Sequence, residues 1–151
     1  MPFCTCFSNL TINNANTGTS SAVVWLASNG TDGASNNIVK NCNIAGASST
    51  TTLIGIGAGS GATGIAITSL GTGNNNNTFE NNNIKAVQFG IYSQGASAAN
   101  KNSGNQFNMN LINTKSGSSQ NVRTIGILAG FENSISVSGN NIGSISGGSP
   151  W

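Results

Sequence analysis

An offset of five residues between a large apolar residue and an isoleucine recurs along the chain and constrains its fold more than any other feature. The first members of the repeated pairs lie 32, 40, 28 and 30 residues apart. Repeats of this length are typical of stacked units that bury an apolar face only against their neighbours. We therefore expect about five stacked coils, one for each of the pairs Phe7 with Ile12, Val39 with Ile44, Phe79 with Ile84, Phe107 with Ile112, and Val137 with Ile142.

Asparagine-rich segments separate the two members of most pairs, as in Asn81-Asn82-Asn83 and Gly139-Asn140-Asn141. An odd offset would place the two apolar residues on opposite faces of one continuous strand. Asparagine favours turns because it tolerates left-handed backbone conformations and its side-chain amide bonds to nearby backbone. Each pair therefore predicts two short strands joined by a tight turn, with both apolar side chains in the core.

A second column lies two residues before each isoleucine and contains Leu10, Cys42, Asn82, Asn110 and Asn140. Buried amides need hydrogen-bond partners, and stacked coils supply them at regular spacing. We expect Asn82, Asn110 and Asn140 to form an internal ladder in which each amide bonds to the next coil.

A third short strand is expected after most pairs. Alternating apolar stretches that contain Gly-Ile occur at residues 64–67, 87–92 and 125–128, and the first repeat has a continuous apolar run at residues 22–26. Both patterns indicate strands. The glycine-rich segment 55–61 has no P-loop signature, and we interpret it as a flexible turn between coils. Three strands per repeat correspond to one coil of a parallel β-solenoid.

Composition supports this architecture. The chain contains 26 Asn and 21 Gly, which disfavour helix. Disorder is the alternative for such a composition, but 36% of the residues are hydrophobic, in periodic positions, and only 5% are charged. The length suits one domain, residues 1–151, which could also be a segment of a longer solenoid.

The repeated pattern of an apolar residue, Asn and Ile, followed by Gly-Ile, resembles the repeats of the pectate-lyase-like superfamily. The resemblance spans residues 3 to 147 and is greatest to the non-enzymatic bacterial surface proteins of that superfamily. It implies an all-β, right-handed parallel β-helix. The superfamily's enzymes use clustered carboxylates, either paired for hydrolysis or holding calcium, so the resemblance does not by itself predict an activity.

The ionisable residues argue against an enzyme. Histidine is absent, and the only acids are Asp32, Glu80 and Glu132, in three different repeats. Lys40 precedes Glu80 by one coil, so we interpret Glu80 as half of an exposed ion pair. We expect no catalytic site, cofactor or metal site. The five Lys and Arg residues are scattered, and no long apolar run occurs, so we expect no nucleic-acid partner and no membrane span.

The cysteines leave two alternatives open. Cys42 occupies the ladder column and suits a small buried residue. Cys4 or Cys6 could instead bridge to Cys42 on the next coil, which would leave one thiol free.

The ends of the chain suggest self-assembly. Terminal coils of solenoids expose apolar interiors and strand edges unless they are capped. Phe3 and Phe7 at one end, and Ile142 and Trp151 at the other, would be exposed in this way. We expect a non-enzymatic structural protein, extracellular or at the cell surface, that stacks end to end into a filament.

Two other functions remain open. A carbohydrate-binding or adhesin module could bind a polysaccharide with Trp25 and Tyr92 as stacking platforms, although ordinary packing is the simpler explanation for both aromatics. An atypical polysaccharide lyase or hydrolase is the third hypothesis.

Overall fold

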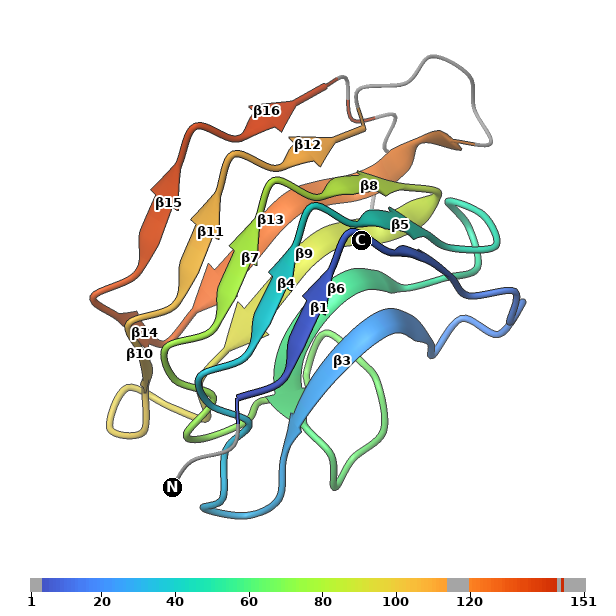
Figure 1. The fold of residues 1–151 in the computed structure, drawn as a ribbon. Helices are drawn as coiled ribbons and strands as arrows, with labels where there is room; N and C mark the ends of the chain where they lie inside the picture. The colour runs from blue at the N-terminus through green and yellow to red at the C-terminus, as the bar shows by residue number, and fades with distance from the viewer. Residues whose placement is uncertain (1–3, 114–119, 144, 146–151) are drawn as a thin grey trace.

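The computed structural model describes residues 4–113, 120–143 and 145, and it folds them into stacked parallel strands without an α-helix in that part of the chain (Figure 1). The chain forms a parallel β-solenoid of about four turns. The predicted all-β fold of stacked parallel coils is confirmed. The fifth apolar pair supplies strands to two sheets but no described strand to the third, so the turns number about four and not five.

Three sheets run along the axis of the solenoid, and successive turns add one strand to each. The first sheet contains β1 (Cys6–Ser8), β4 (Ile38–Lys40), β7 (Thr78–Glu80), β11 (Gln106–Asn108) and β15 (Ser136–Ser138). The second contains β2 (Thr11–Asn13), β5 (Asn43–Ala45), β8 (Asn83–Lys85), β12 (Leu111–Ile112) and β16 (Asn141–Ile142). The third contains β3 (Ala22–Ser28), β6 (Ile54–Ser60), β9 (Val87–Gln94) and β13 (Val122–Gly130). A two-stranded sheet pairs β10 (Asn102–Ser103) with β14 (Glu132–Asn133).

The register of the first two sheets reproduces the columns that the sequence predicts. In the first sheet, the parallel strands align Phe7, Val39, Phe79, Phe107 and Val137. In the second, they align the five isoleucines of the pairs. A slip by one residue would turn every apolar side chain outward, so burial of one face sets this register.

The bend between the first and second sheets has a left-handed backbone in every coil. Its residues are Asn9, Asn41, Asn81, Met109 and Gly139, with φ between 51° and 62°. Asparagine and glycine are the residues that adopt this conformation most readily. The bend lets side chains separated by five residues both point inward.

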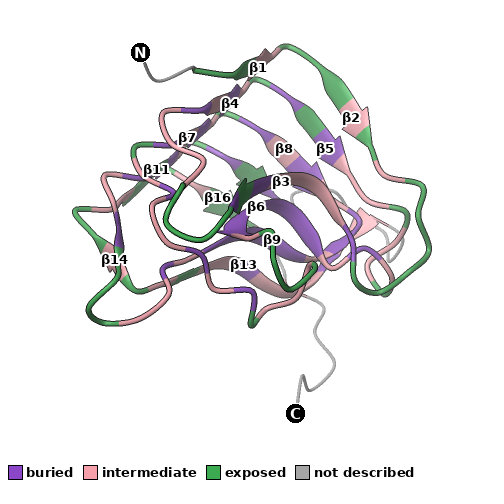
Figure 2. Cartoon of the chain, turned by 90° about the horizontal axis from the view of Figure 1, so that it is seen from below, coloured by how far each residue is buried: buried purple, intermediate pink, exposed green. Residues whose placement is uncertain are grey.

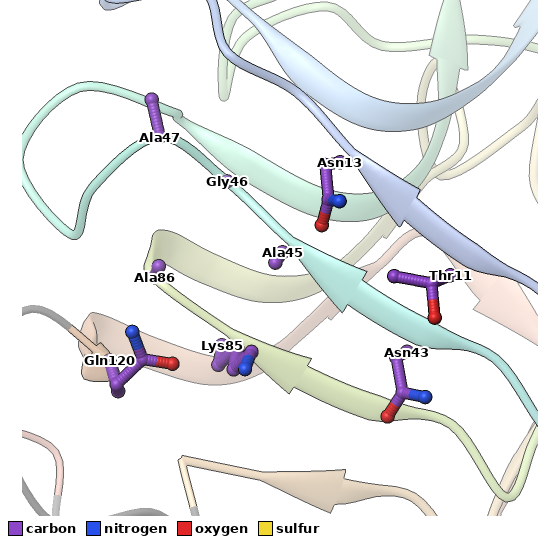
Figure 3. Close-up of a pocket in the computed structure, with 9 residues that line it drawn as sticks. All are labelled: Thr11, Asn13, Asn43, Ala45, Gly46, Ala47, Lys85, Ala86 and Gln120. Atoms are coloured by element: carbon purple, nitrogen blue, oxygen red, sulfur yellow. The ribbon is translucent and has the colours of Figure 1, made fainter.

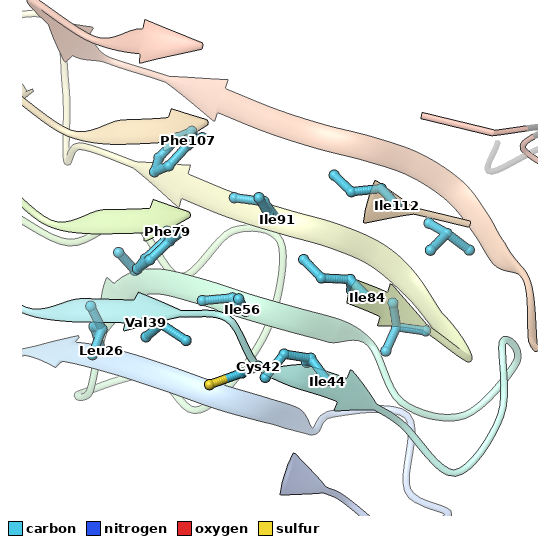
Figure 4. Packing of buried hydrophobic residues seen from close by; sticks show 13 residues of the cluster. Leu26, Val39, Cys42, Ile44, Ile56, Phe79, Ile84, Ile91, Phe107 and Ile112 are labelled. Carbon is cyan, nitrogen blue, oxygen red and sulfur yellow. The ribbon is translucent and has the colours of Figure 1, made fainter. Parts of the chain in front are cut away.

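The core lies between the three sheets and is filled by the apolar pairs of the inner coils (Figures 2 and 4). Val39, Ile44, Phe79, Ile84, Phe107 and Ile112 are fully buried. The rings of Phe79 and Phe107 stack with their centroids 5.2 Å apart. Phe7 and Ile12 in the first coil are half-buried, whereas Val137 and Ile142 in the last are 50% and 45% exposed. The two terminal coils therefore lack part of the cover that neighbouring coils provide.

A column of glycines explains why Gly-Ile recurs in the third sheet. A Cβ on Gly90 would lie 2.5 Å from the Gly126 carbonyl oxygen and 2.8 Å from Cγ2 of Ile112. Gly55 meets Ile84 in the same way, and Gly126 meets Ile142. Only glycine leaves space for the isoleucine of the following coil.

One expected strand is wrong. The structure places β6 at Ile54–Ser60, which covers most of the segment 55–61 that we interpreted as a turn, and it leaves residues 64–67 in a loop. The glycines of β6 are buried under neighbouring elements, and those contacts favour the extended conformation despite the glycine content. Strands were correctly expected at residues 22–26, 87–92 and 125–128.

The internal asparagine ladder is present. The Asn82 backbone N–H donates to Oδ1 of Asn110 at 3.0 Å, and the Asn110 N–H donates to Oδ1 of Asn140 at 2.9 Å. The side-chain amides of Asn82 and Asn110 also donate to the carbonyls of Val39 and Phe79, one coil back. The amides of Asn82 and Asn110 also donate to Oδ1 of the next ladder asparagine, so each of these two connects three consecutive coils.

A second ladder, which the sequence analysis missed, lies on the other side of the first sheet. The Asn37 N–H donates to Oδ1 of Asn77, and the Asn77 N–H donates to Oδ1 of Asn105, both at 2.9 Å. The sequence contains a signal for this ladder, because each of these asparagines lies two residues before the first residue of a repeated apolar pair.

Candidate functional site

The three carboxylates do not form a cluster. Asp32 lies in a tight turn closed by paired backbone hydrogen bonds with Asn29, and Glu80 and Glu132 lie in β7 and β14. Lys40 and Glu80 stand side by side in register, but no ion pair joins them among the described residues. In the described part of the chain, no three His, Cys, Asp or Glu side chains come close enough to hold a metal ion.

Glu132 has the most developed polar environment of the three acids. One carboxylate oxygen accepts from the Ser93 hydroxyl at 2.6 Å and from Nδ2 of Asn102 at 3.3 Å. The other oxygen accepts from Nδ2 of Asn105 at 2.9 Å. Glu132 is the strand partner of Asn102. Its carboxylate therefore accepts hydrogen bonds both from Asn102 and from Asn105, which belong to two different asparagine columns. This arrangement ties the last two coils together and gives the Asn102 amide an acceptor, while the Asn105 amide also donates to the Asn74 carbonyl.

Trp25 and Tyr92 are packed together on the outer side of the third sheet, where Tyr92 is buried and Trp25 is half-buried. Their rings stack with centroids 5.6 Å apart, and Tyr92 is fully buried. The Tyr92 hydroxyl donates to the Ile67 carbonyl at 3.1 Å, and the Trp25 ring covers Gly57 and Gly59. Burial raises the pKa of the Tyr92 phenol to about 12. The proposed role of Tyr92 as an exposed stacking platform is therefore wrong, because the loop at residues 61–71 packs over it.

A polar groove of about 450 Å³ opens on the outer face of the second sheet (Figure 3). Its floor consists of small residues, among them Ala45, Gly46 and Ala86, at the ends of β5 and β8. Asn13 and Asn43 line it with side-chain amides, and Lys85 is the one charged residue in the lining. The groove can offer hydrogen bonds and a positive charge to a polar ligand.

Among the described residues, the large apolar side chains that are exposed lie in the first coil and the last two. Between Leu10 in the first coil and Met109 in the fourth, every large apolar side chain is buried or half-buried. The exposed ones in the described residues are Leu10, Met109, Leu111, Phe131, Val137 and Ile142. Phe3 and Trp151, which we expected at the ends, lie outside the described residues. Among the expected end residues, the structure describes Phe7 and Ile142, one at each end of the stack.

All three cysteines are free. Cys4 and Cys6 are exposed, whereas Cys42 is buried with Sγ 3.1 Å from the Lys40 carbonyl oxygen and 3.7 Å from that of Phe7. Of the two alternatives, the structure has the one without a bridge. In the following coils, the ladder amides donate to the carbonyl of the first apolar residue of the preceding coil, such as Val39 or Phe79. The Cys42 thiol faces the equivalent carbonyl, that of Phe7.

Comparison of the chain with protein-family models, curated proteins and solved structures found no match. The solenoid is thus shown by the structure, and the likeness to the pectate-lyase-like superfamily remains a resemblance of repeats. No helix with the length and apolarity of a membrane span occurs among the described residues.

Proposed function

We propose that this protein is a non-enzymatic structural solenoid that associates end to end through its terminal coils. The observation that carries the proposal is the distribution of exposed large apolar side chains, which in the described part of the chain occur only in the first coil and the last two. Ordinary surface positions would scatter such residues along the solenoid. Leu10, Val137 and Ile142 stand in inward columns whose other members are buried in the inner coils, and their exposure in the first and last coils supports a contact with another coil.

The strand edges favour the same contact. β1 and β2 are the first strands of their sheets, and β15 and β16 are the last, so each has one edge without a strand partner in the described chain. Unpaired edges are templates for a further strand, and natural proteins usually protect them with charge or proline. None of these four strands contains a charged residue or a proline. Because the two ends are different surfaces, their contact is heterologous and generates an open polymer unless the rotation between copies closes a ring.

The test compares two double variants that add the same charge. Val137→Lys with Ile142→Lys places two ammonium groups at inward positions of the proposed contact, whereas Gln106→Lys with Asn141→Lys places them at outward positions of β11 and of the terminal strand β16. We expect the wild type and the outward variant to sediment as polymers that electron microscopy shows as filaments, and the end variant to remain monomeric. Circular dichroism checks that both variants are folded. A wild type that stays monomeric at high concentration contradicts the proposal.

The absence of enzymatic activity and an extracellular or cell-surface location are parts of the same proposal. Separated acids and the lack of histidine support the first, because hydrolysis of a glycosidic bond uses two carboxyl groups about 5 to 9.5 Å apart. The resemblance to surface members of the pectate-lyase-like superfamily supports the second. We expect no cleavage of pectin or alginate, with or without calcium. Cleavage that disappears in Glu132→Gln or Glu80→Gln would overturn the non-enzymatic assignment.

The groove on the second sheet favours a second candidate, a carbohydrate-binding module. Its amides suit hydroxyl groups, and Lys85 suits the carboxylate of an acidic sugar. We expect an oligouronate to bind more tightly than a neutral maltooligosaccharide of equal length, and Lys85→Gln to remove that preference. Lys101→Gln is the matched control, since Lys101 is exposed in a loop away from the groove lining. Equal affinity for both sugars would leave this candidate without support.

A further inference from the structure

We infer that the end-to-end contact has one defined register, in which β1 of a second copy lies beside β15 and β2 of that copy lies beside β16. This inference rests on the proposed self-association and names its partner as a second copy of the chain. In this register the apolar columns continue across the contact, with Phe7 over Val137 and Ile12 over Ile142.

The backbone of the two terminal coils supports this register. The first coil bends at Asn9 with φ of 58°, and the last bends at Gly139 with φ of 62°. In both coils the bend lies between strands that carry one apolar side chain each, five residues apart. Every neighbouring pair of coils within the molecule stacks with these positions aligned. The two ends therefore have the same backbone profile as coils that already pair.

The side chains at the two ends are also compatible. Phe7 and Ile12 are half-buried, and Val137 and Ile142 are about half exposed, so each end has apolar surface left to cover. The four strands at the contact carry no charge, and stacking brings no like charges together. The third sheet ends one coil earlier in the described chain, at β13, and the contact is therefore made by the first two sheets.

The asparagine ladder would lack one hydrogen bond at this contact. Within the molecule, the N–H of each ladder residue donates to Oδ1 of the next asparagine, from Cys42 to Asn82, then to Asn110 and to Asn140. Across the contact, residue 10 of the second copy follows Asn140, and Leu10 has no side-chain acceptor. A variant that supplies the acceptor should therefore strengthen association.

Disulfide trapping tests the register with a native thiol. Cys6 corresponds to Ser136 in the outward column of the first sheet, through Ile38, Thr78 and Gln106. In the inferred register Cys6 of one copy therefore lies beside Ser136 of the next, within the Cα separation that a disulfide spans. Ser136→Cys is introduced in a Cys4→Ser background and oxidised glutathione is added. The two protein thiols are oxidised to one disulfide, and glutathione disulfide is reduced to two thiols.

We expect Ser136→Cys to give a series of covalent oligomers on a non-reducing gel. Gln106→Cys is the matched control, because it places the thiol in the same outward column but one strand further from the end. Equal cross-linking of both variants, or none in Ser136→Cys, would overturn the register. If the wild type polymerises in sedimentation while Ser136→Cys does not cross-link, the register fails and the proposed function stands. A monomeric wild type contradicts both.

Leu10→Asn is the second test and should increase affinity. The added acceptor would receive the Asn140 N–H of the neighbouring copy, and one hydrogen bond corresponds to roughly a fivefold lower dissociation constant. Leu10→Ala removes the same apolar side chain without adding an acceptor and serves as the control. The inference is wrong at this position if Leu10→Asn associates no more tightly than Leu10→Ala.

Discussion

Neighbouring asparagines in this chain have different structural roles that depend on their position in the coil. Asn81 adopts the left-handed bend with φ of 51°, and its amide donates to Oδ1 of Asn41 at 2.8 Å. Asn82 is fully buried in the ladder. Asn83 faces outward, and its amide donates to Oδ1 of Asn43 at 3.3 Å. Asparagine is repeated because its short amide satisfies backbone groups in turns and between coils.

At the residue scale, we expect Asn110→Leu to destabilise the fold more than Asn100→Ala. Asn110 is fully buried, and its loss leaves the Asn82 N–H without its side-chain acceptor and removes the amide bond to the Phe79 carbonyl. Each buried group left unpaired costs about 1 to 3 kcal/mol. Asn100 is exposed and bonds only within its own loop. Urea unfolding measures both variants, and equal midpoints would contradict the role of the ladder.

Tyr92 predicts a pH dependence at alkaline pH. Burial raises its pKa from 10.0 to about 12, so the unfolded state loses the phenolic proton before the folded state does. The stability that the neutral phenol contributes is fully present below about pH 10 and is lost as the pH rises toward 12. In Tyr92→Phe, the decrease in unfolding free energy between pH 9 and pH 11.5 should be smaller than in the wild type. Parallel pH profiles for the two proteins would argue against a buried neutral phenol.

At the scale of the strand, backbone space matters as much as side-chain character. The third sheet approaches the second closely, and the glycines at positions 55, 90 and 126 leave space for isoleucines of the next coil. β6 shows this most clearly, because a segment rich in glycine is a buried strand there. Strand propensity reflects packing against neighbours more than an intrinsic backbone preference.

Gly90→Ala should therefore destabilise the protein by about 1 to 3 kcal/mol, the usual effect of overpacking. The new methyl group would lie 2.5 Å from the Gly126 carbonyl oxygen, and backbone cannot move away as a flexible side chain does. Gly61→Ala is the control, since its nearest neighbours would be at 3.2 and 3.3 Å and the position is exposed. Thermal unfolding of the two variants should differ clearly, and a stable Gly90→Ala would show that the sheets can separate without loss.

At the scale of the whole molecule, each inner coil is covered by its two neighbours, whereas the described residues supply a neighbouring coil on only one side of each terminal coil. The free energy of unfolding of such a stack is close to the sum of the intrinsic stabilities of the coils and the energies of the contacts between neighbouring coils. Ile112 and Ile142 occupy the same column, but Ile112 is fully buried and Ile142 is 45% exposed. The position of a coil in the stack thus decides how much its core residues contribute to the free energy of unfolding.

We expect Ile112→Ala to cost about 2 to 5 kcal/mol and Ile142→Ala distinctly less, when both are measured at dilution where the protein is monomeric. The chemical change is identical, so the difference reports burial alone. If copies associate end to end as proposed, the effect of Ile142→Ala should increase with protein concentration, because the second copy would cover this side chain. Chemical denaturation at two protein concentrations measures this difference. Equal losses of unfolding free energy in the two variants at dilution would contradict the exposure of the last coil.

The sequence by itself determined the repeat columns, the bend and the first ladder. Parallel stacking places the same position of each coil in the same environment, so chemical similarity along the chain reports structural equivalence. The offset between Phe79 and Ile84 therefore predicted a register that the structure reproduces. The second ladder through Asn77 could have been predicted in the same way, because it follows the same spacing.

Only the tertiary structure decided the features that depend on insertions between the repeats. The loop at residues 61–71 covers Tyr92. This loop is an insertion between repeats, and no periodic pattern in the sequence predicts where such an insertion packs. β6 and the contacts of Glu132 depend on residues from other coils, such as Ser93 and Asn105. Their environments are made by chain segments distant in sequence, whose approach is set by packing and not by local pattern.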